Sequence, residues 1–68
     1  MAGNIKHIID RIIEQRAKGN PLLVETTKAK LIFKGINPDT YSDLSFDDPR
    51  IEARLREIAA DWGVFLRP

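Results

Sequence analysis

The single histidine, His7, is the first residue to consider for acid–base or nucleophilic chemistry, because the 68 residues contain no cysteine. A nucleophilic site needs a Ser, Thr or Cys whose proton is taken by a neighbouring base. His7 lies on the polar side of a predicted helix, with Lys6 and Arg11 as its charged neighbours. A few helices built from so short a chain also leave little room for a concave pocket that excludes water. We therefore expect a surface histidine, no enzymatic activity and no bound cofactor.

Four aspartates, Asp39, Asp43, Asp47 and Asp48, raise the question of a divalent cation. A calcium-binding loop places its ligands at alternate positions, with a central glycine and a closing glutamate. Here the spacing is four, four and one, and no glycine lies among them. Capping and turn roles explain these residues better, because short acidic side chains accept backbone hydrogen bonds at helix starts. The sequence thus predicts no metal site.

Positive charge is concentrated in the first half of the chain. Residues 1–36 carry a net charge of +4 and residues 37–68 one of −3, so the total is only +1. Lys28, Lys30 and Lys34 form a candidate basic patch for nucleic acid. Against this function, the isoelectric point of about 8.1 is modest, and Lys28 projects to a different side of a helix from Lys30 and Lys34. Weak nucleic-acid binding is therefore the alternative hypothesis.

Large apolar side chains in the second half of the chain are the candidate contacts for a protein partner. They are Trp62, Phe65, Leu66, Tyr41 and Phe46. Aromatic residues are enriched at the buried centres of interfaces, but a small core can equally use them for its own packing. The favoured function is a protein–protein interaction or regulatory module. A homodimer is one possible arrangement, because the oppositely charged halves can dock on one another.

Three Asn-Pro or Asp-Pro pairs divide the chain: Asn20-Pro21, Asn37-Pro38 and Asp48-Pro49. The Asn or Asp side chain caps a helix, and Pro at the first helical position loses no hydrogen bond because that N–H has no helical partner. Gly19 and Gly35 precede the first two pairs, where a helix end favours a left-handed residue. We expect an all-α domain, a small bundle of three principal helices. The helices span about 4–18, 21–34 and 49–62, and the connector 35–48 holds one short helical turn.

The first and third helices each carry one apolar stripe. Isoleucines of the first helix fall on one arc of the helical wheel, and apolar residues of the third recur at i, i+4, i+7 and i+11 from Ile51. The predicted core comprises Ile5, Ile8, Ile9, Ile12, Leu22, Ala29, Phe33, Ile51, Leu55, Ile58 and Trp62.

The segment 21–34 is apolar on two sides. One stripe consists of Leu22, Thr26, Ala29 and Phe33, and the other of Val24 and Leu31. Two stripes predict the central helix of the bundle, with neighbours on both faces. The β-branched residues make a strand over 23–33 the competing interpretation, but no second alternating run offers a partner strand.

The chain is small for an independent domain, so burial of its apolar tail would add to a limited core. After Gly63, the expected end of the third helix, residues 64–66 either fold back on the helix or become covered in a dimer.

No apolar run approaches the roughly 18 residues of a membrane span, and charges interrupt residues 1–20, unlike a signal peptide. The sequence predicts one cytoplasmic domain over residues 1–68.

Overall fold

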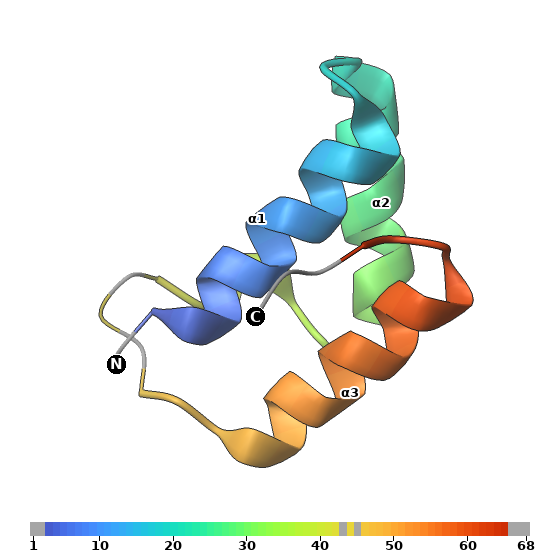
Figure 1. The fold of residues 1–68 in the computed structure, drawn as a ribbon. Helices are drawn as coiled ribbons and strands as arrows, with labels where there is room; N and C mark the ends of the chain where they lie inside the picture. Colours follow the sequence, from blue (N-terminus) through green and yellow to red (C-terminus); the bar gives the residue numbers. More distant parts are fainter. Residues whose placement is uncertain (1–2, 43, 45, 66–68) are drawn as a thin grey trace.

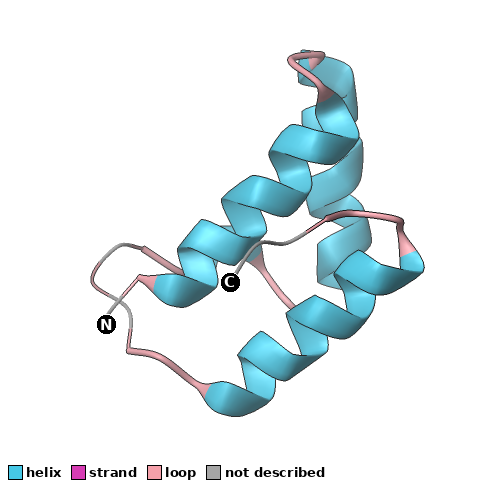
Figure 2. Ribbon diagram, in the orientation of Figure 1, coloured by secondary structure: helices cyan, strands magenta, loops and turns pink. Residues whose placement is uncertain are grey.

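The computed structural model describes residues 3–42, 44 and 46–65. Its elements are α1 (Asn4–Ala17), α2 (Pro21–Phe33), the single-turn 3-10 helix η1 (Pro38–Thr40) and α3 (Pro49–Asp61), as Figures 1 and 2 show. The described part of the chain contains no strand. The predicted bundle of three helices with a helical turn in the connector is therefore confirmed, and the strand interpretation of 23–33 is wrong.

The Asn-Pro and Asp-Pro pairs start their helices as predicted. Side-chain oxygens of Asn20, Asn37 and Asp48 each accept a hydrogen bond of 3.0 Å from the backbone N–H two residues further along. Each cap is followed by Pro at the first helical position. The caps matter because the first N–H groups of a helix have no partner within it.

Both α2 and α3 end at a left-handed glycine that turns the next residue back into the core. Gly35 has φ +87° and Gly63 has φ +69°. The N–H of Ile36 donates to the Leu31 carbonyl at 3.0 Å, and that of Val64 donates to the Ala59 carbonyl at 2.8 Å. This pattern, a Schellman motif, places an apolar residue against the end of its own helix. Ile36 and Val64 are accordingly buried.

Helix α1 lies at the centre of the bundle and packs against both α2 and α3 (Figure 1). Three of the fully buried large side chains belong to α1, and the others come from α2, from the residue after its terminal glycine, and from α3: Ile5, Ile9, Ile12, Leu31, Ile36 and Leu55. Ile58, Ala59 and Val64 complete the cluster. The predicted core residues Ile8, Ile51 and Trp62 are partly buried and pack against this cluster.

Two predictions about α2 are wrong. The central helix is α1, not α2. The stripe placed in the core, Leu22, Ala29 and Phe33, is exposed to solvent. The opposite side of α2 packs against α1 instead, through the buried residues Thr27 and Leu31.

The turn between α1 and α2 contains a strained residue, which gives a prediction about stability. Lys18 has φ +49° and ψ +41°, in the left-handed region, and is followed by Gly19 at φ +84°. A residue with a Cβ loses about 1–2 kcal/mol there, while glycine is more flexible in the unfolded chain. Lys18→Gly should therefore raise the free energy of unfolding by about 0.5–1 kcal/mol in urea titration.

The matched control is Glu14→Gly, at an exposed position inside the right-handed helix. This change should lower the free energy of unfolding by about 1 kcal/mol. Equal destabilisation by both glycines would show that Lys18 is not left-handed in solution.

Candidate protein-interaction surface

Among the described residues, seven large hydrophobic residues are exposed, and four of them (Leu22, Leu23, Ile32 and Phe33) belong to α2. Leu22 and Phe33 lie on the side of α2 opposite to its buried residues Thr27 and Leu31. We call Leu22, Thr26, Ala29 and Phe33 the outer face of α2. Their spacing of four, three and four keeps them within a narrow arc at about 100° per residue. Leu22 is 73% exposed and Phe33 is 91% exposed, while Leu23 and Ile32 extend the apolar surface on either side. Isolated exposed apolar residues are common, whereas a continuous patch on one element is typical of a binding surface.

Small and satisfied side chains explain why the other side of α2 packs against α1. Thr27 is buried, and its hydroxyl donates to the Leu23 carbonyl at 2.7 Å, so no polar group is left unpaired. Leu31 is fully buried, and Val24 is half-buried. A face built from Val, Thr and Leu lets the two helices approach more closely than one built around Phe33.

The candidate basic patch is divided between two sides of α2. Lys28 is half-buried, whereas Lys30 and Lys34 are exposed beside the outer face. Arg54 of α3 donates through Nε to the Lys34 carbonyl at 3.1 Å, which adds a further positive charge at this end of α2. The positive charge therefore borders the outer face at its C-terminal end and does not form a continuous stripe.

Trp62 and Phe65, two of the predicted partner contacts, lie against the second half of α1. The guanidinium carbon of Arg16 lies 5.6 Å from the centre of the Trp62 ring, and Arg16 donates to the Trp62 carbonyl at 3.3 Å. The Gln15 side chain accepts from the Phe65 N–H at 2.9 Å and donates to the Phe65 carbonyl. The tail thus folds back onto α1, although the Phe65 side chain remains 72% exposed. The remaining predicted tail contact, Leu66, lies outside the described residues.

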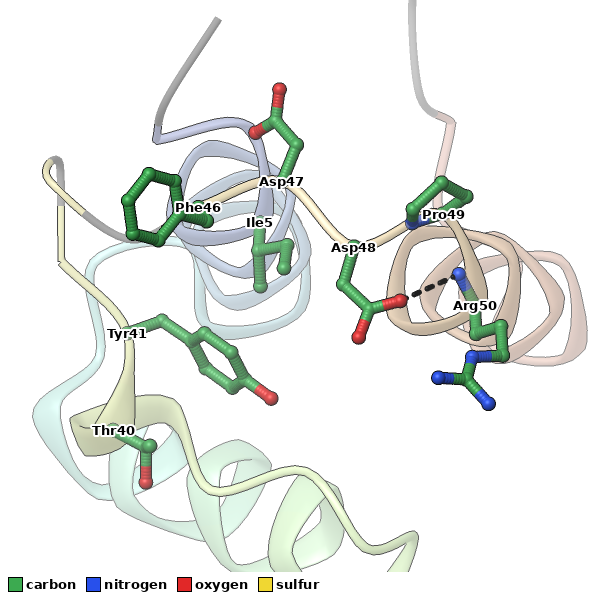
Figure 3. A pocket seen from close by; sticks show the side chains of 8 residues that line it. All are labelled: Ile5, Thr40, Tyr41, Phe46, Asp47, Asp48, Pro49 and Arg50. Atoms are coloured by element: carbon green, nitrogen blue, oxygen red, sulfur yellow. Dashed lines mark hydrogen bonds between the residues drawn. The ribbon is translucent and has the colours of Figure 1, made fainter.

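Tyr41 and Phe46 lie near the opposite end of α1, beside an open hollow of about 660 Å³ (Figure 3). Ile5 also lines this hollow, and the Asp48 carboxylate points to the N–H of Arg50. Tyr41 is half-buried against the core, whereas Phe46 is 91% exposed. Ile5 and Arg16 are separated by about 16 Å along α1, at about 1.5 Å per residue. The predicted partner contacts therefore form two separate groups and not one patch.

The residues considered for catalysis and metal binding are dispersed. His7 is exposed on α1. Asp47 accepts hydrogen bonds from the backbone N–H and side-chain amide of Asn4, and Asp48 caps α3. Asp43 lies outside the described residues. Within the described ranges, no three His, Cys, Asp or Glu side chains are grouped closely enough to hold a metal ion.

The helices of the described chain are too short and too charged for any of them to cross a membrane. No family model, curated protein or solved structure matches this chain.

The orientation of α2 predicts very different effects of two neighbouring substitutions on stability. Phe33→Ser should change the free energy of unfolding by less than about 0.5 kcal/mol, because the side chain is exposed. Leu31→Ala should lower it by about 2–5 kcal/mol, because it opens a cavity beneath α1. Urea titrations at low protein concentration measure both values. A larger loss for Phe33→Ser than for Leu31→Ala would mean that α2 is rotated by about half a turn.

Proposed function

We propose that this protein is a small cytoplasmic protein–protein interaction or regulatory module whose docking surface is the outer face of α2. The observation that carries the proposal is the exposure of Leu22 and Phe33 on a helix whose opposite side is already packed against α1. Burial of apolar surface lowers the free energy by about 25 cal/mol per Å², and side chains that remain in water do not gain this stabilisation. A partner that covers the outer face recovers this free energy.

The shape and charge of the surface favour a helix as the partner element. The outer face is an apolar ridge on a regular helix, and helices pack by setting such ridges into the grooves of a neighbour. Leu22 and Phe33 lie three turns apart and act as anchors, whereas Thr26 and Ala29 between them permit close approach. Lys30 and Lys34 border the ridge and favour acidic side chains on the partner's flank.

The alternative, nucleic-acid binding through Lys28, Lys30 and Lys34, has less support. Lysine contacts to phosphate are strongest when the positive charges line one face. Here Lys28 is half-buried on one side of α2, and an apolar ridge occupies the face beside Lys30. Apolar side chains contribute little to contacts with the phosphate backbone.

Site-specific photocrosslinking in the cell tests the proposal. A photoreactive amino acid at Ala29, in the middle of the outer face, should form covalent adducts with protein at high yield. The same group at Glu57, exposed on α3, serves as the matched control and should form few. Adduct masses identify whether the partner is another protein or a second copy of the chain.

Phe33→Ser combined with the probe at Ala29 should reduce the adduct yield at least several-fold, because it removes an anchor without disturbing the core. Equal yields from Ala29 and Glu57, or adducts to nucleic acid alone, would contradict the proposed function.

A further inference from the structure

We propose that the end of the described chain is a hinged strap, which the side chain of Gln15 holds against α1 and which opens without unfolding the three helices. The strap consists of Val64 and Phe65, and the hinge is the left-handed Gly63 that precedes them. No residue of the outer face of α2 takes part, so the strap is independent of the docking role proposed for that face.

Gln15 holds the strap through both polar atoms of its side-chain amide. Its Oε1 accepts from the Phe65 N–H at 2.9 Å, and its Nε2 donates to the Phe65 carbonyl. A residue of an antiparallel strand pairs with its neighbour through the same two backbone groups, so the amide acts as a partner strand of one residue. Fifty residues separate Gln15 from Phe65 in the chain, which makes this pairing a tertiary contact and not part of the end of α3.

Apart from this pairing, the strap is held through Val64. The Val64 side chain is 8% exposed and belongs to the core cluster, and its N–H donates to the Ala59 carbonyl at 2.8 Å. Phe65 contributes little burial, because its side chain is 72% exposed. A segment with one buried side chain and solvent-exposed hydrogen bonds opens at a lower free energy than a whole domain. The strap therefore opens more often than the domain unfolds.

The hinge allows the strap to move while α3 stays in place. Gly63 has φ +69°, and a Cβ at this position would meet no atom within 4 Å beyond its chain neighbours. Glycine adopts both signs of φ without steric cost, so the direction of the chain can change here. Trp62, just before the hinge, is held separately by Arg16, which donates to its carbonyl at 3.3 Å. Rotation at Gly63 therefore moves the strap and leaves Trp62 on α1.

The state of the strap decides how much apolar surface the protein exposes at this end. In the closed state, Val64 belongs to a core cluster that includes residues of α1, α2 and α3. In the open state, Val64 and the core atoms that it covers are in contact with water. Gln15 is thus a positioning residue that biases a two-state element towards its closed form.

Amide hydrogen exchange followed by NMR tests this opening. In the wild type, the Val64 N–H should exchange faster than the Leu31 N–H inside α2. Its rate should not change with low concentrations of urea, because the opening exposes little surface. The Trp62 N–H, bonded to the Ile58 carbonyl before the hinge, should exchange more slowly than the Val64 N–H.

Gln15→Ala removes both hydrogen bonds of the amide, so exchange of the Val64 N–H should accelerate about tenfold. Val64 is the informative probe, because its N–H is bonded to Ala59 and not to Gln15. Glu14→Ala is the matched control, since Glu14 is exposed one position earlier on α1. This change should leave the Val64 rate within about twofold of the wild type.

A Val64 N–H with the same exchange rate and urea dependence as that of Leu31 would overturn the inference, because the strap would then open only when the domain unfolds. An unchanged Val64 rate in Gln15→Ala would also overturn it, since Gln15 would then protect only the Phe65 N–H to which it is bonded. Equal rates for Trp62 and Val64 would show that the end of α3 unwinds with the strap, which contradicts a hinge at Gly63.

Discussion

The buried isoleucines of α1 lie between α2 and α3, and the arrangement of the other elements follows from them. Ile5, Ile9 and Ile12 are buried to 2% exposure or less, so α1 offers apolar contacts along most of its length. Since isoleucine is a poor helix former by intrinsic preference, this helix is stabilised mainly by packing. Each neighbouring helix needs only one apolar side to cover its part of the α1 surface. For α2, that leaves a second apolar side facing solvent.

Most of the fold can be predicted from local residue chemistry. Capping by Asn20 and Asp48, proline at the first helical position and the terminal glycines set the helix boundaries to within a residue. These are short-range effects between residues close in sequence, so the sequence is sufficient to predict them. Burial of Ile36 and Val64 was also predictable in principle, because a Schellman glycine turns the next apolar residue towards its own helix.

The rotation of α2 could not be predicted in this way. Leu22 and Phe33 are larger and more apolar than Thr27, so the pattern favours burying the wrong side. The side that packs against α1 is instead the one that carries Thr27 and Leu31. Burial of Thr27 leaves no polar group unpaired, because its hydroxyl donates to the Leu23 carbonyl. Which of two apolar sides is packed depends on the shape of the neighbouring helix, which is a tertiary property. The sequence pattern therefore favours aromatic residues elsewhere as the candidate site and places Leu22 and Phe33 in the core.

The same rotation connects the fold to the proposed function. If α2 were central, its second apolar side would be covered by α3, and no continuous ridge would remain. Because α1 is central, α2 keeps a straight apolar ridge exposed to solvent. Substitutions of its exposed side chains leave the core intact. The tail contributes to stability through the Gln15 contacts and Val64, whereas Leu22 and Phe33 of α2 remain largely exposed.

Paramagnetic relaxation of methyl groups by an inert soluble agent tests this rotation most directly. The measurement compares Leu22 with Leu31 at a protein concentration low enough to keep the chain monomeric. The account predicts strong relaxation of the Leu22 methyls, which are largely exposed, and almost none for Leu31, which is fully buried. Strong relaxation of Leu31 together with a protected Leu22 would contradict it.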